Sequence, residues 1–283
     1  WRPPDDIPVR AVVLALHVWN DYRRAFAAVG PALAAHGVAT YAYDQRGFGE
    51  TQAAGVWHGG RRLAEDMRAM AKLLRASYPG RPLYAIGESL GGAVLLSTLQ
   101  QPPPDIDGTI LIAPAVWARD TMPLLQRISL WLAAHVTPAE TLTGKFLHIS
   151  PSDNEDMLRA LRADPLIIKA TRIDVLYGTA NLMDNAYAAA AKLLMPALIL
   201  YGQHDEIIPK QPICDMVEEL PRGAQRRWRM AYYPDGYHML TRDLHRQAVL
   251  ADIAAWLLNP RAALPSGDEI LTEDNPQAPF CGR

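Results

Sequence analysis

The 283-residue sequence predicts an α/β fold, with a mostly parallel central sheet flanked by helices and interrupted by a helical insertion. Three observations carry this prediction. Short, continuous apolar runs, typical of strands buried on both faces, alternate with stretches of helical periodicity. The alternation stops over residues 116–194 and then resumes. Hydrophobic residues make up 49% of the chain and charged residues 20%, so the side chains of a large core are present.

The first part of the chain alternates regularly between strands and helices. The apolar runs predict strands over residues 11–16, 38–43, 83–86 and 109–113. Helical spacing of apolar residues predicts helices over residues 26–36, 61–78 and 93–99. Gly37 is a suitable C-cap for the first helix, and Pro79 with Gly80 ends the second. Strands that alternate with helices favour a parallel sheet covered on both faces.

The insertion and the end of the chain complete the predicted domain organisation. Helical segments fill the insertion without a convincing strand, at residues 124–134, 155–161 and 181–192. The core then resumes with strands over 197–201 and 227–233 and helices over 212–220 and 242–258. Residues 259–283 are rich in Pro, Gly and Asp and are expected to form a poorly ordered tail. The core is therefore assigned to residues 1–115 and 195–258, and the insertion to residues 116–194.

Composition excludes several classes of protein. The formal net charge of −2 gives no electrostatic case for a nucleic-acid partner. No apolar run reaches the ~18 residues that a membrane span needs. The two cysteines, Cys214 and Cys281, are too few for a disulfide framework or a four-cysteine zinc site. The chain starts at Trp1 without a visible signal peptide, so a removed upstream segment is expected and the compartment, cytoplasmic or exported, stays open.

A candidate nucleophile lies between a predicted strand and a predicted helix. Gly87-Glu88-Ser89-Leu90-Gly91 fits the pattern G-x-S-x-G in the strand–turn–helix context that a nucleophile elbow requires. Such a tight turn needs small flanking residues, and it exposes the serine hydroxyl at the carboxyl end of the sheet. The helix that follows favours negative charge developing at its N-terminus. Ser89 is therefore predicted to be the nucleophile of a hydrolase.

A serine nucleophile needs a base and an acid that orients the base. His238 lies on a loop between a strand and the last helix, from which it can reach over the sheet. The other histidines after Ser89 are better explained as surface or packing residues: His135, His148, His204 and His245. Asp205 is the first carboxylate after its strand and the preferred acid. Its rivals are Glu206, one residue later, and Asp235, in a Pro-Asp-Gly turn where aspartate is ordinary.

Five segments in order resemble one family. They are Ala-Leu-His-Val-Trp-Asn-Asp-Tyr, Tyr-Asp-Gln-Arg-Gly-Phe-Gly, Gly-Glu-Ser-Leu-Gly-Gly, Tyr-Gly-Gln-His-Asp-Glu-Ile-Ile-Pro and a Gly-Tyr-His loop. Together they are similar to the monoacylglycerol lipase/lysophospholipase group of the α/β-hydrolases, over residues 10–258. The resemblance implies an α/β-hydrolase fold, a Ser89–Asp205–His238 triad, and a helical cap formed by the insertion. It also implies an oxyanion hole made by the backbone N–H groups of Trp19 and Leu90.

The sequence departs from the pattern of this group at two places. Its relatives usually have His-Gly in the first motif, whereas His17 is followed here by Val18. Because valine resists positive φ, we expect either a misdirected Trp19 N–H and a weak esterase, or a loop that reaches its geometry with negative φ at Val18. In the second case Val18 fills space beside the acyl pocket. Relatives also begin with an additional strand pair, and this chain starts near its end.

The insertion offers candidate substrate contacts. Trp117, Ile128 and Trp131 belong to an apolar stripe that serves helix packing or an acyl chain. Part of this stripe is expected to face a membrane surface transiently.

The sequence as a whole predicts a serine carboxylic-ester hydrolase for small single-acyl lipid esters such as monoacylglycerols or lysophospholipids. No metal or cofactor is needed for this chemistry. Two alternatives remain, a peptidase or amidase that uses the same triad, and a catalytically impaired binding protein of the same fold.

Overall fold

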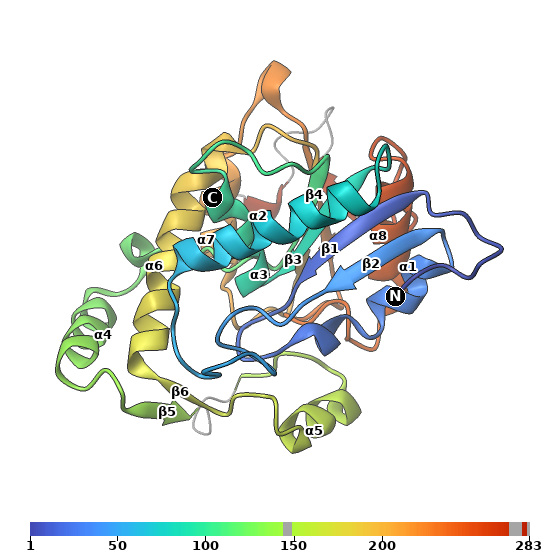
Figure 1. Ribbon diagram of the computed structural model, residues 1–283. Coiled ribbons are helices and arrows are strands. Elements are labelled where there is room, and N and C mark those ends of the chain that lie inside the picture. Colours follow the sequence, from blue (N-terminus) through green and yellow to red (C-terminus); the bar gives the residue numbers. More distant parts are fainter. Residues whose placement is uncertain (144–148, 272–278, 282–283) are drawn as a thin grey trace.

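The computed structural model describes residues 1–143, 149–271 and 279–281, and a seven-stranded sheet forms the centre of this part (Figure 1). The strands lie side by side in the order β2 (Val38–Ala42), β1 (Ala11–Leu16), β3 (Leu83–Glu88), β4 (Gly108–Ile112), β7 (Ala197–Gly202), β8 (Trp228–Tyr233) and β9 (Glu269–Leu271). All neighbouring pairs are parallel except β8 and β9. The predicted α/β fold with a mostly parallel sheet is confirmed.

Helices cover both faces of the sheet. One face packs against α2 (Gly60–Ser77), α3 (Leu90–Thr98) and α7 (Lys210–Glu219), and the other against α1 (Val29–Ala34) and α8 (Arg246–Leu258). Strand β1 shows why its sequence is apolar throughout. Leu14 and Leu16 pack on the face covered by α2, α3 and α7, whereas Val13 and Ala15 pack on the face covered by α1 and α8. All four side chains are completely buried.

The insertion forms a cap at one end of the sheet (Figure 1). Its elements are α4 (Leu124–Val136), β5 (Thr141–Thr143), α5 (Glu155–Ala163), β6 (Ala170–Arg172) and α6 (Ile173–Ala189). The structure differs here from the prediction of an insertion without strands, because β5 and β6 pair as a small antiparallel sheet. Three-residue strands are too short to leave a periodic pattern in the sequence. Helix α6 also begins well before the predicted residue 181.

The first residue of the chain is held by strand β2. The backbone N–H of Thr40 in β2 donates to the Trp1 carbonyl, and the Trp1 amino group donates to the Thr40 carbonyl, both at 2.8 Å. The first residue therefore lies beside β2, at the edge of the sheet.

The C-terminal region differs from the predicted poorly ordered tail. Strand β9 extends the sheet beside β8, and a disulfide joins Cys281 to Cys214 of α7. Phe280 is buried and packs edge-on against Tyr201 and Tyr232. The partners of these residues are distant in sequence, so local composition did not indicate them.

Candidate active site

Ser89 lies on a sharp turn between β3 and α3. Its backbone has φ of 50° and ψ of −108°, a conformation that a residue with a side chain rarely adopts. A Cβ atom on Gly91 would lie 2.1 Å from the Leu16 carbonyl oxygen, and one on Gly87 would lie 2.5 Å from the backbone of Gly91. Only glycine fits at both positions, so the G-x-S-x-G pattern reflects real crowding. The predicted turn geometry is present.

Asp205 and His238 form a buried pair. Asp205 Oδ2 lies 2.8 Å from His238 Nδ1, and the two side chains are 0% and 4% exposed. Asp205 Oδ1 accepts hydrogen bonds from the backbone N–H groups of Ile207 and Ile208, each at 2.9 Å. These bonds fix the carboxylate, which in turn fixes the orientation of the imidazole.

Close contact between two loops makes this pair feasible. A Cβ atom on Gly202 would lie 2.4 Å from the Gly236 carbonyl oxygen, so the loops after β7 and β8 touch. The His204 N–H donates to the same Gly236 carbonyl at 2.8 Å. Because β3, β7 and β8 are parallel, Ser89, Asp205 and His238 all follow carboxyl ends of strands at one edge of the sheet.

The rival residues lie elsewhere. Glu206 accepts a hydrogen bond from the Ser150 N–H at 2.9 Å, and Asp235 is exposed to solvent. His204 packs against the Tyr237 ring, and His135 stacks on Trp131 in α4. His245 is exposed at the start of α8. His148 lies outside the described residues.

The loop that carries Trp19 is positioned by His17. The Gln45 N–H donates to His17 Nε2 at 3.0 Å, so the proton of a neutral ring is on Nδ1, which donates to the Val18 carbonyl at 2.8 Å. Burial lowers the pKa of His17 and so favours the neutral ring. In a trans peptide the Val18 carbonyl and the Trp19 N–H point in opposite directions. The His17 bond therefore sets the direction of the Trp19 N–H.

The N–H groups of both predicted oxyanion donors are available to donate a hydrogen bond. Within the described part of the chain, neither the Trp19 N–H nor the Leu90 N–H has a hydrogen-bond acceptor. Backbone φ is positive at Asn20, with 62°, and not at Val18. The loop thus reaches its geometry with negative φ at Val18. Of the two outcomes expected at Val18, the backbone shows the second, and the left-handed residue of this loop is Asn20.

Three buried charges link the loops of the site. Arg242, four residues after His238, has Nη1 at 2.6 Å from Asp21 Oδ2 and Nη2 at 3.6 Å from Glu88 Oε2. Burial raises the pKa of Glu88, and Arg242 opposes that shift. The sequence reasoning missed this group. A carboxylate directly before Ser89, at the end of an apolar strand, was the signal that could have revealed it, because such a charge needs a buried partner.

Two of the three predicted substrate contacts of the cap, Ile128 and Trp131, lie on α4. Trp117 is half-buried, whereas Ile128 and Trp131 of α4 are 53% and 52% exposed. Ile128 and Trp131 line a groove of about 740 Å³ beside α6, together with Tyr187. The structure does not bring either residue to Ser89, and their role stays a prediction.

No helix within the described residues is long and apolar enough to cross a membrane. The same residues contain no cluster of three or more His, Cys, Asp or Glu side chains able to hold a metal ion.

Comparisons with known proteins agree with this geometry. A family described as "Serine aminopeptidase, S33" matches residues 7–245. The chain is 26% identical to the monoacylglycerol lipase of Mycolicibacterium smegmatis over 274 residues, which cover 92% of this chain and 91% of that relative.

Solved structures of similar shape include two lipases. A Paleococcus ferrophilus monoacylglycerol lipase has a TM-score of 0.75 and 21% identity, and the match covers 89% of this chain and 95% of that one. A soluble variant of the Saccharomyces cerevisiae monoglyceride lipase, in complex with a substrate analogue, has a TM-score of 0.77 and 21% identity, with 91% and 89% covered. The predicted resemblance is confirmed. The chain belongs to the serine aminopeptidase S33 family and has the α/β-hydrolase fold.

Proposed function

We propose that this protein is a serine carboxylic-ester hydrolase that acts on single-acyl lipid esters such as monoacylglycerols or lysophospholipids. The observation that carries the proposal is the 2.8 Å contact between Asp205 and His238, at the edge of the sheet where Ser89 adopts its strained turn. The names of its relatives, which include monoacylglycerol lipases, support the ester substrate.

Each residue of the site has a definite task in this reaction. Asp205 binds His238 Nδ1, so the other ring nitrogen, Nε2, takes the proton from Ser89 Oγ as that oxygen attacks the ester carbonyl. The N–H groups of Trp19 and Leu90 stabilise the oxyanion. His238 then protonates the leaving alcohol. Water activated by His238 attacks the acyl-enzyme, and a fatty acid leaves while Ser89 regains its proton.

A substrate panel tests this proposal. Glycerol esters and p-nitrophenyl esters of increasing chain length should be hydrolysed, and the Ser89→Ala variant should hydrolyse none of them at a comparable rate. Folded protein without activity on any ester of the panel would contradict it.

A peptidase or amidase is the second candidate, because the family description names an aminopeptidase. The same triad can cleave amides, so the choice depends on the substrate. Comparison of a p-nitrophenyl ester with an aminoacyl anilide at equal concentration decides between the two. An ester hydrolase should cleave only the ester at a measurable rate, whereas a peptidase should cleave the anilide as well.

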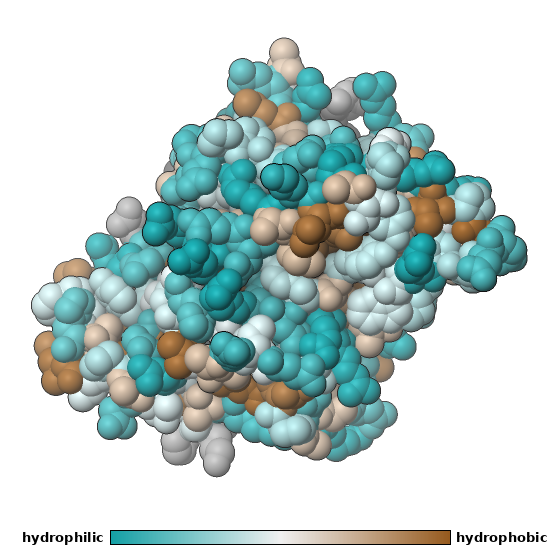
Figure 2. Space-filling model, in the orientation of Figure 1, coloured by the Kyte–Doolittle hydropathy of each residue, from teal (hydrophilic) through white to brown (hydrophobic). Residues whose placement is uncertain are grey.

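We also propose that α4 touches a lipid surface while substrate enters. No residue of α4 is buried, and six of its apolar side chains are more than half exposed: Leu124, Leu125, Ile128, Trp131, Leu132 and Val136. Apolar side chains are visible over α4 at the left edge of Figure 2. Exposed apolar patches of this kind commonly mark contact surfaces. Sedimentation with phosphatidylcholine vesicles should fall in Leu125→Gln, and an unchanged bound fraction would contradict this contact.

A further inference from the structure

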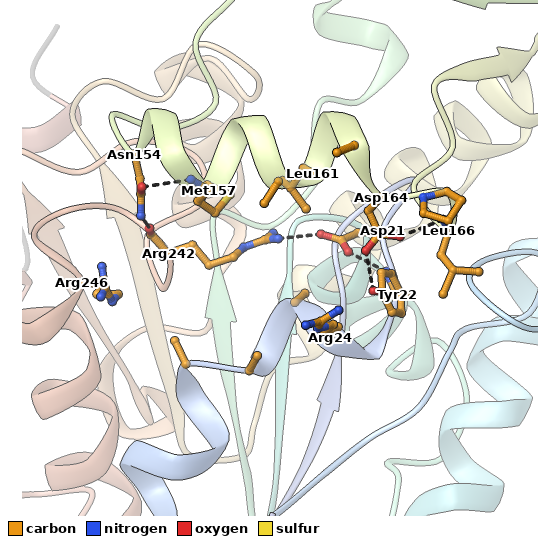
Figure 3. A pocket seen from close by; sticks show the side chains of 16 residues that line it. Asp21, Tyr22, Arg24, Asn154, Met157, Leu161, Asp164, Leu166, Arg242 and Arg246 are labelled. Atoms are coloured by element: carbon orange, nitrogen blue, oxygen red, sulfur yellow. Dashed lines mark hydrogen bonds and ion pairs between the residues drawn. The ribbon is translucent and has the colours of Figure 1, made fainter.

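A second groove lies on the other side of the cap, between α5 and the short helix Arg23–Phe26 (Figure 3). Its volume is about 780 Å³, which is in the range of small-molecule sites. Neither Ser89, Asp205 nor His238 lines it. We call it the α5 groove.

One wall of the α5 groove is apolar. Met157 and Leu161 are four residues apart on α5 and face the groove, which Ala25, Ala28 and Leu166 also line. Leu158 is the one buried residue of α5. The apolar face of this helix is therefore partly left without protein partners, which suits an alkyl chain.

A buried arginine crosses the groove beneath α5. Figure 3 shows the Arg242 side chain directed at Asp21, and that side chain is 8% exposed. Its Nη1 binds Asp21, and its Nη2 faces Glu88. Arg242 Nε has no acceptor within the described residues. Arg242 Nη2 and Glu88 Oε2 also have no hydrogen-bond partner among these residues. Buried guanidinium N–H groups without an acceptor are uncommon, so Arg242 can still bind an oxygen atom.

Two further arginines make the groove positive. Arg24 and Arg246 line it, and neither forms a salt bridge with a residue that the structure describes. The groove also holds Asp164, which accepts hydrogen bonds from the Tyr22 hydroxyl at 2.6 Å and the Leu166 N–H at 2.9 Å. The Tyr22 bond, aided by Arg24, holds the pKa of Asp164 below its ordinary value. Asp21 balances the charge of Arg242, and Asp164 is bound by the Tyr22 hydroxyl and the Leu166 N–H, so Arg24 and Arg246 supply the charge that suits an anion.

We propose that the α5 groove binds a free fatty acid, with its carboxylate among Arg242, Arg24 and Arg246 and its chain along Met157 and Leu161. This inference rests on the proposed function, because hydrolysis of a single-acyl ester releases such an acid. Arg242 and Asp21 also belong to the loops of His238 and Trp19. An acid bound in the groove therefore contacts the ion pair that joins the two catalytic loops.

Laurate binding to enzyme with a blocked active site tests the inference. Ser89 is first labelled with a hexadecyl fluorophosphonate, so that laurate cannot bind as a product at the nucleophile. Calorimetry should then show one laurate per chain, and 1-dodecanol should bind about tenfold more weakly because it lacks the charge. If dodecyl phosphate binds tenfold more tightly than laurate, the groove is a site for a phospholipid head group. That result would overturn the proposal that it binds a fatty-acid carboxylate.

Matched variants locate the binding. Leu161→Trp fills the groove, and the double variant Arg24→Gln/Arg246→Gln removes two charges. Each should weaken laurate binding about tenfold or more. The controls are Leu73→Trp on the exposed face of α2 and Arg159→Gln/Arg162→Gln on the outer face of α5, which should bind as the parent does.

The outcomes separate this inference from the proposed function. Unchanged affinity in either groove variant, or no binding to the labelled enzyme, would overturn the fatty-acid site. Failure of the fluorophosphonate to label Ser89 would overturn the proposed function instead. The groove variants still report on the groove in that case, because they lie on α5 and on residues 24 and 246, away from Ser89.

Discussion

The catalytic loops of the core and the helices of the cap differ in how they are held. Ser89, Asp205 and His238 are at most 7% exposed, and each follows a strand of the buried sheet. In the cap, α4 has no buried residue and α5 has one. The sheet therefore fixes the proposed catalytic residues, whereas most of α4 and α5 is exposed to solvent. Chemistry is expected to depend on the core, and selection of ligands on the cap.

The two regions also contrast in their ion pairs. Arg242 pairs with Asp21 in the core, and their side chains are 8% and 4% exposed. Arg162 pairs with Glu155 in the cap at 3.8 Å, and their side chains are 67% and 62% exposed. The first pair is shielded from water, and the second is screened by it.

The largest expected effect concerns the nucleophile in the core. Ser89→Ala should lower kcat/KM for a p-nitrophenyl ester by a factor of about 10⁴ or more, because the attacking oxygen is lost. The urea midpoint of unfolding should not fall, since the side chain supports no other contact that the turn requires. Retention of more than a few per cent of activity would contradict the role of Ser89.

Loss of the core ion pair comes next. Arg242→Met leaves Asp21 and Glu88 buried without their cation, so the free energy of unfolding should fall by about 3–5 kcal/mol. Arg162→Gln, the matched change in the cap, should cost less than about 0.5 kcal/mol. Urea titrations of both variants measure the difference. Equal losses of unfolding free energy in the two variants would contradict the claim that the core ion pair stabilises the fold more than the cap ion pair does.

Val18→Gly separates packing from catalysis within the core. Val18 is buried, so its removal together with the flexibility of glycine should cost about 2 kcal/mol of stability. Because Val18 has negative φ and His17 fixes the next peptide, kcat should stay within about twofold of the parent while longer acyl chains become acceptable. A substantial rise in kcat would instead indicate that Val18 impairs the oxyanion hole.

The pH dependence of stability gives the smallest effect. His17 has a pKa below the ordinary 6.5, so the unfolded chain binds the extra proton first as pH falls. Stability from His17 is therefore fully present above pH 6.5 and declines below it, by up to about 1.4 kcal/mol per pH unit. The stability difference between the parent and His17→Gln should shrink from pH 7.5 to 5.5.

The sequence alone predicted the core of the molecule well. Buried parallel strands such as residues 11–16 are continuous apolar runs, and the tight turn at Ser89 leaves glycines at fixed spacing. Asp205 and His238, whose catalytic role stays a proposal, were expected to lie together because the loops after parallel strands converge at one edge. Each of these signals is local, so a single sequence contains it.

Features that depend on distant partners were not predicted. The Cys214–Cys281 disulfide joins residues 67 positions apart, and β9 exists only beside β8. Arg242 contacts Asp21, which lies 221 residues earlier in the chain, and no periodic pattern in the sequence indicates that the two are neighbours. The direction of the α4 side chains also depends on how the cap lies on the core, so helical spacing could not decide between packing and exposure.

Covalent labelling of the parent protein tests the central claim most directly. A fluorophosphonate reacts only with a serine whose hydroxyl is activated by a base. The account predicts a single adduct on Ser89, identified by mass spectrometry of the digested protein, and labelling slowed by about 10³-fold or more in His238→Gln. An adduct at another residue, the absence of any adduct on folded protein, or equal labelling rates in the two proteins would contradict it.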